Sequence, residues 1–242
     1  MYFVDPDGMQ SERNDGVVYG QASDQGHWSD SIREQKSHNT PPDDITVNSK
    51  GIVTNVVKNN KPNRFFDENG QQLFFNDPEN DFSEIDSWAV GDELYTPISE
   101  NQLAEGVRNA GLSPLLLRAQ GKLGEAWLMA AYMSHGSADF TMSYLVPNFM
   151  TNSEAAHSDI GRFRTEYNSY TRFFRFGNSK SIYNLYDAGN FMWGNWMGMN
   201  GFSLGSLKTG ANINSVIFSQ SIDTKPDKRA IKNGFNFYRF RR

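Results

Sequence analysis

Two consecutive sequence patterns typical of β-hairpins occur in the first half of this chain, and they limit its fold to one that contains a small sheet. Runs rich in Ile, Val, Thr and Phe alternate with turn residues, and these runs are residues 45–47, 52–57, 64–66 and 72–75. The second turn ends in Asn69-Gly70, and Asn-Gly accepts the positive φ that tight hairpin turns need. The sequence therefore predicts a small antiparallel β-meander over about residues 45–76, followed by an acidic connector to about residue 100.

Helical spacing replaces this pattern after residue 100. The pair Ser113-Pro114 is typical of a helix start, and Gly136 of the end of the same helix. One face of that helix is predicted to carry its apolar residues, which are Leu116, Leu123, Trp127, Ala130 and Met133. A second helix is predicted from about residue 153 to Gly177, with an aromatic-rich stripe of Ile160, Phe163, Tyr167, Tyr170 and Phe174.

The chain beyond residue 200 is predicted to hold shorter elements. Two helices are expected over about residues 203–212 and 226–233, and Gly234 is expected to end the second. Residues 235–240 alternate apolar with polar side chains, which fits either a final strand or the start of a loose basic tail. The expected fold class is α+β: a flexible N-terminal linker, a small antiparallel β-meander, and then a mainly α-helical domain.

Composition along the chain gives the expected domain limits. Residues 9–44 are rich in Ser, Asp, Gln and Gly and lack apolar periodicity, which is typical of a flexible linker. We therefore expect residues 1–44 to be a leading segment and linker, 45–99 a small acidic β-rich module, and 100–242 a mainly helical domain. No run of about 18 apolar residues is present, so stable membrane insertion is not expected.

The charge is distributed unevenly between the two halves. Residues 1–100 carry 7 Lys/Arg and 19 Asp/Glu, whereas residues 101–242 carry 16 and 9, so the net charges are −12 and +7. A basic half can meet an anionic polymer such as nucleic acid, an acidic cell-wall glycan or a lipid head-group surface. The alternative is that these charges form ordinary solvated helix faces.

A stretch from Tyr186 to Ser203 mixes glycines with asparagines and large aromatic residues. Glycine permits close backbone approach, and Asn and Asp supply hydrogen-bonding groups. One interpretation is a shaped cleft with a polar floor, and the other is a tight glycine-bearing turn that packs aromatic residues into the core. On the first interpretation the substrate-binding residues are Tyr186, Asn190, Trp193 and Gly194.

Carboxylates are the candidate catalytic groups. Polymer hydrolysis by acid–base chemistry needs two carboxyl groups in different environments, and the candidates outside regular helical stripes are Asp139, Asp187, Asp223 and Asp227. Helix capping is the alternative for Asp223 and Asp227, and a turn role is the alternative for Asp139. The four histidines show no metal-ligand spacing and no phosphate-binding glycine loop is present, so no metal site and no cofactor are predicted.

Two parts of the chain resemble segments of bacterial toxins. Residues 1–9 contain Asp5-Pro6-Asp7-Gly8, which resembles the segment where the RHS-repeat shell of polymorphic toxins ends and a variable toxin begins. Residues 125–238 resemble the bacterial polymorphic toxin type 44 family, although Ala138 and Thr141 replace the Trp and Lys expected there. The segments that carry this second resemblance are 136–140, 189–194 with Gly198 and Gly201, and Asp223 with Pro226-Asp227, Ile231, Gly234 and Tyr238.

The resemblance implies an exported effector that is delivered into rival cells. Its partners would be a cognate immunity protein and the RHS-type shell of the parent chain, and its substrate an anionic polymer. Three functions stay open. The first is a hydrolase of a cell-envelope polymer such as peptidoglycan, which the aromatic stretch and the loop carboxylates favour. The second is a nuclease, which the basic half favours. The third is a non-enzymatic binding domain.

Overall fold

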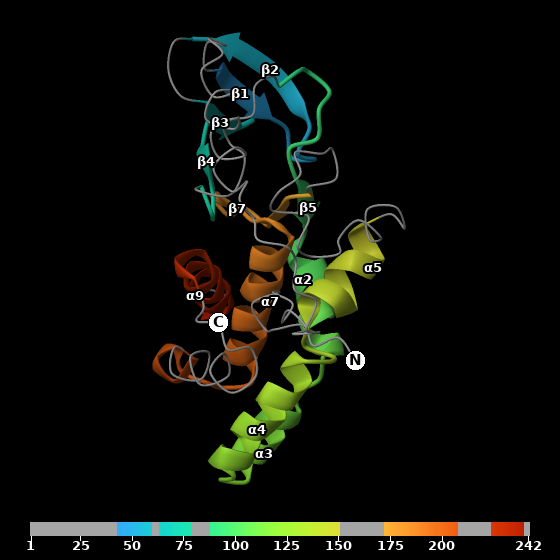
Figure 1. Cartoon of the computed structure of the whole chain (residues 1–242), viewed down its shortest axis with the longest axis vertical. Coiled ribbons are helices and arrows are strands. Elements are labelled where there is room, and N and C mark those ends of the chain that lie inside the picture. Colours follow the sequence, from blue (N-terminus) through green and yellow to red (C-terminus); the bar gives the residue numbers. More distant parts are fainter. Residues whose placement is uncertain (1–42, 60–62, 79–87, 151–171, 208–223, 240–242) are drawn as a thin grey trace, which may run out of the picture.

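The computed structural model describes residues 43–59, 63–78, 88–150, 172–207 and 224–239. It confirms the α+β fold class: a mixed sheet lies at one end, and helices make up the rest (Figure 1). The predicted linker up to residue 42, most of the predicted second helix and Asp223 lie outside the described residues. In the described ranges no helix is long and apolar enough to cross a membrane.

Five strands form the larger sheet, in the order β2-β1-β3-β4-β7. Their bounds are β1 Asp43–Val47, β2 Val53–Lys58, β3 Arg64–Asp67, β4 Gln72–Phe75 and β7 Ser181–Ile182. Both predicted hairpins are present, since β1 pairs antiparallel with β2 and β3 with β4. The sheet is not an antiparallel meander, however, because β1 pairs parallel with β3, and β4 pairs parallel with β7 from more than a hundred residues further on.

The parallel pairing has a simple physical reason. It brings Ile45 opposite Phe65, which in turn faces Leu73 on β4, and all three side chains are buried. One face of the sheet thus collects the apolar residues of both hairpins in a single small core. Phe173 and Ile182 from the later part of the chain complete that core.

Hydrogen bonds and an ion pair cross the predicted boundary at residue 99. Strand β5, Thr96–Ile98, pairs parallel with β6, Phe174–Phe176. The buried Arg175 guanidinium on β6 binds Asp67 of β3 at 3.1 Å and the Tyr95 hydroxyl at 3.0 Å. Because both members of this ion pair are buried, removal of either would leave an uncompensated charge in the interior. The sheet and the helical part therefore share strands as well as a core.

The predicted end of the second helix is wrong, because strand β6 lies there. That helix was expected to run to Gly177 with Phe174 in its stripe, but residues 174–176 are extended and fully buried. Gly177 has a φ of 50° and turns the chain from β6 into β7. The spacing of aromatic residues alone does not separate such a short buried strand from a helix.

The predicted helix over residues 113–136 is two helices. Helix α3 spans Ser113–Ala119 and α4 spans Leu123–Ser134, after α2 at Glu100–Asn109. Gly121 separates them because its φ of 78° is left-handed and interrupts the helical path. Ser113 is not the N-cap expected of it, since Leu112 holds that position without a side-chain hydrogen bond. A π-helical turn η1, Thr141–Leu145, and α5, Val146–Phe149, follow α4.

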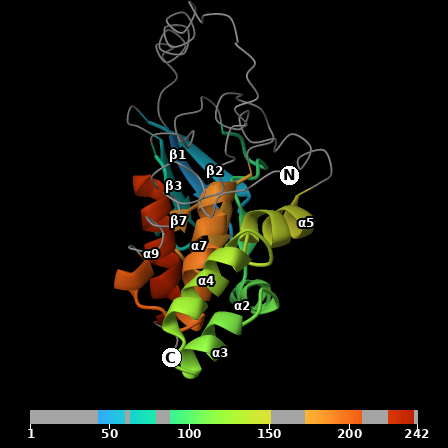
Figure 2. The ribbon, with the colours of Figure 1, turned by 60° about the horizontal axis from the view of Figure 1, so that its bottom comes forward.

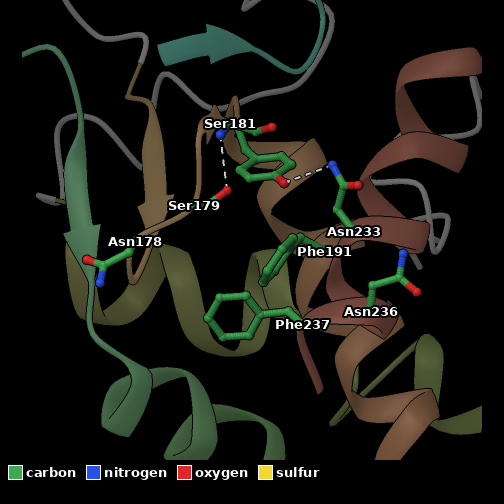
Figure 3. A pocket seen from close by; sticks show the side chains of 8 residues that line it. Asn178, Ser179, Ser181, Phe191, Asn233, Asn236 and Phe237 are labelled. Carbon is green, nitrogen blue, oxygen red and sulfur yellow. Dashed lines mark hydrogen bonds between the residues drawn. The ribbon is translucent and has the colours of Figure 1, made fainter. Parts of the chain in front are cut away.

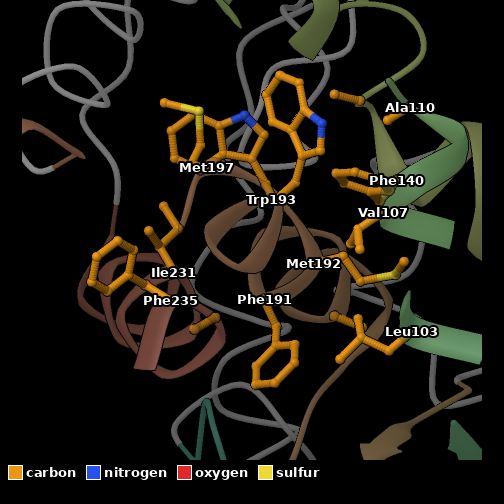
Figure 4. Packing of buried hydrophobic residues seen from close by; sticks show 14 of the residues in the cluster. Leu103, Val107, Ala110, Phe140, Phe191, Met192, Trp193, Met197, Ile231 and Phe235 are labelled. Carbon is orange, nitrogen blue, oxygen red and sulfur yellow. The ribbon is translucent and has the colours of Figure 1, made fainter. Parts of the chain in front are cut away.

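Two long helices, α7 and α9, organise the helical core. Helix α7 spans Leu185–Met199 and α9 spans Lys225–Arg239. Gly234 does not end α9, and the strand predicted over residues 235–240 is absent from its described part, which continues the helix to residue 239. Figure 4 shows α7 end-on, with side chains of α2 on one side and of α9 on the other. Helix α7 is thus the centre of the larger hydrophobic core.

Glycines let α7 and α9 approach closely. A Cβ added to Gly194 would lie 2.1 Å from the carbonyl oxygen of Ile231, and one added to Gly234 would lie 1.8 Å from that of Phe191. Both distances are far below van der Waals contact, so backbone fills the space where a side chain would stand. Gly234 is therefore a packing residue inside a helix, which explains why it does not act as a helix stop.

Candidate functional site

The stretch of glycines and aromatic residues is not a tight turn, but its aromatic residues do pack into the core, as the second interpretation expected. Most of it is helix α7, which is buried along nearly its whole length. Asn184 caps the helix by accepting a hydrogen bond from the Asp187 backbone N–H at 2.9 Å. Because glycine is a poor helix former, local preference argued against this helix, and packing against α2, α9 and η1 stabilises it.

Asp187 lies in the first turn of α7, where a negative charge is favoured by the helix dipole. Its carboxylate is 2 % exposed and accepts a hydrogen bond from the Asn76 side-chain amide at 2.8 Å. The same amide nitrogen donates to the Pro226 carbonyl at 3.0 Å. Asn76, directly after β4, therefore joins the sheet to the first turns of both long helices.

Asp227 occupies the corresponding place in α9. Its carboxylate is 3 % exposed and binds the Thr224 backbone N–H at 2.7 Å and the Thr224 hydroxyl. The Thr224 hydroxyl accepts in return from the Asp227 backbone N–H at 3.4 Å, so the two residues cap the helix reciprocally. The Asn190 side chain reaches across from α7 and donates to Asp227 at 3.2 Å.

The structure thus brings together three of the predicted site residues: Asp187, Asn190 and Asp227. They form a buried polar junction between the sheet and the two long helices. The helix-capping alternative describes what Asp227 does, and its catalytic role, like that of Asp187, stays a prediction. Asp223 lies outside the described residues.

The other predicted substrate-binding residues point elsewhere. The Trp193 indole is buried and donates to the Ser134 hydroxyl at 2.7 Å, so it packs between α7 and α4. Gly194 faces the α9 backbone, as described above. Tyr186 is half-buried in the first turn of α7. None of these three residues is among the described residues that line the pocket discussed below.

Asp139 lies at the opposite side of α7 from α9, next to the π-helical turn. Its carboxylate accepts from the Met142 backbone N–H at 3.2 Å, and Thr141 of the same turn fills the space beside Gly189. Burial raises the pKa of Asp139 to about 6, while the backbone N–H groups of Met142 and Thr141 act in the opposite direction. A carboxyl group with this pKa can hold a proton close to neutral pH.

The raised pKa predicts a pH-dependent stability. Because the folded pKa is above the ordinary value of 3.8, the protonated carboxyl stabilises the fold below about pH 4, and this contribution is lost as the pH rises through 6. Relative to Asp139→Asn, the wild-type free energy of unfolding should fall by roughly 2 kcal/mol between pH 4 and pH 7, after allowance for partial exposure. Urea denaturation at both pH values measures this difference. A control variant, Glu125→Gln, should follow the wild type, and parallel profiles for Asp139→Asn and wild type would refute the burial effect.

An open pocket lies beside the polar junction, between the β6–β7 turn and α9 (Figure 3). Its volume is about 580 Å³. Asparagine amides, hydroxyl groups and three aromatic rings make up its wall, and the lining residues are Asn178, Ser179, Ser181, Tyr183, Phe191, Asn233, Asn236 and Phe237. None of these described lining residues carries a charged side chain.

Neighbouring groups hold the pocket wall in place. The Phe191 ring stacks on Phe176 with centroids 4.2 Å apart, and Phe237 meets Phe191 edge-on at 5.5 Å. Asn233 donates to the Tyr183 hydroxyl at 3.1 Å. Burial raises the pKa of Tyr183 above its ordinary value of 10, so its hydroxyl stays protonated.

The residues of α9 that line this pocket could have been found in the sequence. Asn233, Asn236 and Phe237 have the spacing of three and four residues that places side chains on one helical face. The prediction ended the helix at residue 233, so it separated Asn233 from the other two. The side chains of the β6–β7 turn carry no such signal, because only tertiary structure brings them to α9.

The described ranges contain no group of three or more His, Asp or Glu residues placed to hold a metal ion. Comparisons with family models, with curated proteins and with solved structures find no match for the chain. The resemblance to RHS-linked type 44 toxins therefore rests on the motif residues alone. What the structure itself defines is the class: an α+β protein with an uncharged pocket beside a buried polar junction.

Proposed function

We propose that this chain carries the toxin domain of a secreted bacterial effector and that it acts on a cell-envelope polymer such as peptidoglycan. The toxin part of the proposal rests on the sequence motifs near residues 5–8 and 136–140 and in the later segments. The choice of an envelope polymer rests on the pocket. The proposed partners of the chain are a cognate immunity protein and the RHS-type shell of the parent chain. The proposed site of action is the target cell.

The single observation that carries the choice of polymer is the uncharged, amide-rich pocket wall. Each asparagine side chain offers one acceptor and two donors, which matches the paired hydroxyl and amide groups of a sugar ring. The Phe237 ring offers an apolar face to the carbon–hydrogen side of such a ring. A concave site with a few polar groups among apolar ones is the usual form of a small-ligand site.

The same wall disfavours the nuclease alternative. Nucleic-acid binding draws most of its affinity from Lys and Arg that neutralise phosphates. Lys180 is exposed in the β6–β7 turn, but neither it nor any other cation is among the described lining residues. A pocket of this kind fits the neutral sugar rings of an envelope polymer better than its anionic groups.

Hydrolysis is the reaction that we propose, with aspartate carboxyl groups as acid and base. Asp139 has a pKa suited to a general acid but lies on the side of α7 that faces away from α9 and the pocket, and Asp187 and Asp227 are buried in the junction. The described lining holds no carboxyl group, and this observation favours a second candidate function, a glycan-binding domain without catalysis.

Growth assays that use the whole chain separate these functions. Expression in a bacterial host with an export signal is expected to kill the cells, and expression without it to leave them viable, because the proposed polymer lies outside the cytoplasm. Killing only from the cytoplasm would contradict the proposal and favour a nuclease. Killing after export that Asp139→Asn leaves unchanged would remove Asp139 from the reaction, and release of soluble wall fragments would distinguish hydrolysis from binding.

A further inference from the structure

Helix α9 carries positive charge along its exposed side. The helix lies at the outer edge of the helical part, with its other side packed on α7 (Figures 1 and 2). Four exposed cations, Lys225, Lys228, Arg229 and Lys232, follow each other at spacings that place them on one helical face. The one acid in the sequence of α9, Asp227, is buried. We call these four cations the basic stripe.

The basic stripe is unfavourable for the helix by itself. Like charges three or four residues apart repel each other, and cations in the first turn oppose the helix dipole. Lys225 and Lys228 lie in that first turn, and neither they nor Lys232 form an ion pair with any residue that the structure describes. Helix α2, in contrast, combines Glu105 with Arg108. A bound anion would relieve the repulsion in α9.

The basic stripe leads directly to the pocket. Arg229 lies four residues before Asn233, and Lys232 lies four residues before Asn236, so each cation is next to a lining asparagine on the helix surface. Figure 3 shows both asparagines on the side of α9 that forms the pocket wall. The Arg229 guanidinium donates to the Asn76 carbonyl, which holds this cation beside the end of β4. A ligand in the pocket can therefore extend along the stripe.

The dimensions of the stripe fit a short acidic peptide. An α-helix rises about 1.5 Å per residue, so the stripe from Lys225 to Lys232 is roughly 10 Å long. An extended peptide rises about 3.3 Å per residue, so about three of its residues match this length. In a nucleic acid, phosphates flank every sugar on both sides. The cations of α9 whose side chains are described all precede Asn233, so they lie on one side of the pocket residues.

We propose that the basic stripe binds the carboxylates of a peptide that is attached to the sugar in the pocket. Peptidoglycan has this chemistry, because short peptide stems with free carboxylates branch from its sugar chain. The uncharged pocket takes the sugar ring, and Lys225, Lys228 and Lys232 take the acidic stem. The inference rests on the proposed function of the pocket, and it makes the stripe the part that distinguishes a peptide-bearing glycan from an uncharged one.

Calorimetric titration of the full chain with two ligands tests this assignment. One ligand is the disaccharide–peptide fragment of peptidoglycan, and the other is the uncharged disaccharide of N-acetylglucosamine. At low ionic strength the double variant Lys228→Gln/Lys232→Gln is expected to bind the fragment about tenfold more weakly than the wild type and the uncharged disaccharide equally well. The double variant Lys50→Gln/Lys122→Gln removes two other exposed lysines and should match the wild type with both ligands.

The outcomes separate this inference from the proposed function. If Lys228→Gln/Lys232→Gln binds the fragment like the wild type, or loses affinity equally for both ligands, the stripe does not bind the acidic stem, and sugar recognition in the pocket can still stand. If the wild type binds neither ligand, both proposals are wrong. Tighter binding of a single-stranded oligonucleotide than of the fragment, weakened by the same double variant, would assign the stripe to nucleic acid and overturn the inference.

Discussion

Residues 95–242 expressed without the preceding chain are expected to show no cooperative unfolding transition, whereas residues 43–242 are expected to keep one. The shorter fragment retains β6 and β7 but loses β4, which pairs with β7. It also loses Asp67, and this leaves the buried Arg175 guanidinium without its carboxylate partner. Phe173 and Ile182 would lose the core into which they pack. Losing a buried charge partner alone costs about 3–5 kcal/mol, which is comparable to the whole stability of many domains.

Thermal denaturation followed by circular dichroism compares the two fragments. The fragment of residues 43–242 is the control because it keeps every described contact. A sharp transition for residues 95–242 at the same temperature would show that the helical part is independent of the sheet. Toxicity assays should therefore use the whole chain. A lack of toxicity in the short fragment would reflect its failure to fold and not a lack of activity in the folded protein.

Gly234→Ala is expected to destabilise the fold by about 3 kcal/mol or more. The added Cβ would lie 1.8 Å from the Phe191 carbonyl oxygen, and the obstacle is backbone, which cannot rotate away. Helices α7 and α9 would have to separate, and overpacking of a well-packed core typically costs 1–3 kcal/mol or more. Because Ala is a better helix former than Gly, local propensity predicts the opposite sign.

Urea denaturation of Gly234→Ala against Gly205→Ala decides between packing and propensity. Gly205 has no atom within 3.5 Å of an added Cβ, and its nearest neighbour is the Ser203 hydroxyl at 3.9 Å. Its replacement should therefore change the free energy of unfolding by less than about 0.5 kcal/mol. An unchanged or higher stability of Gly234→Ala would contradict the close crossing of α7 and α9.

The parts of the fold that follow from local chemistry could be predicted from the sequence. Both hairpins, around residues 48–51 and 67–70, are correct because turn residues and β-branched runs act over a few residues. The parallel β1–β3 and β4–β7 pairs could not be predicted in this way, since the pairing of distant strands leaves no local pattern.

Glycines account for most of the errors in the helices. Gly121 interrupts a predicted helix. Gly194 and Gly234, in contrast, lie inside helices, although the low helix propensity of glycine disfavours helix at both positions. The difference lies in tertiary structure: Gly121 adopts a left-handed φ, and the other two make room for backbone across a helix crossing. A sequence pattern does not distinguish the two uses.

The candidate site was predictable only in part. Asp187, Asn190 and Asp227 were singled out from two segments far apart in the chain, and they lie together in the buried junction, where Asn190 binds Asp227 and Asn76 binds both Asp187 and the Pro226 carbonyl. Trp193 and Asp139 belong to the other side of α7. The pocket was missed because its α9 residues were divided between a predicted helix and a predicted strand, and the β6–β7 turn meets them only in three dimensions.

The most direct test of the proposed function is a calorimetric titration of the full chain with a soluble disaccharide–peptide fragment of peptidoglycan. The wild type is expected to bind it, and Asn236→Ala to bind at least tenfold more weakly, because Asn236 lines the pocket. Asn101→Ala, at an exposed position of α2, is the matched control and should bind like the wild type. Equal binding by all three proteins, or none by the wild type, would contradict recognition of a sugar ring in this pocket.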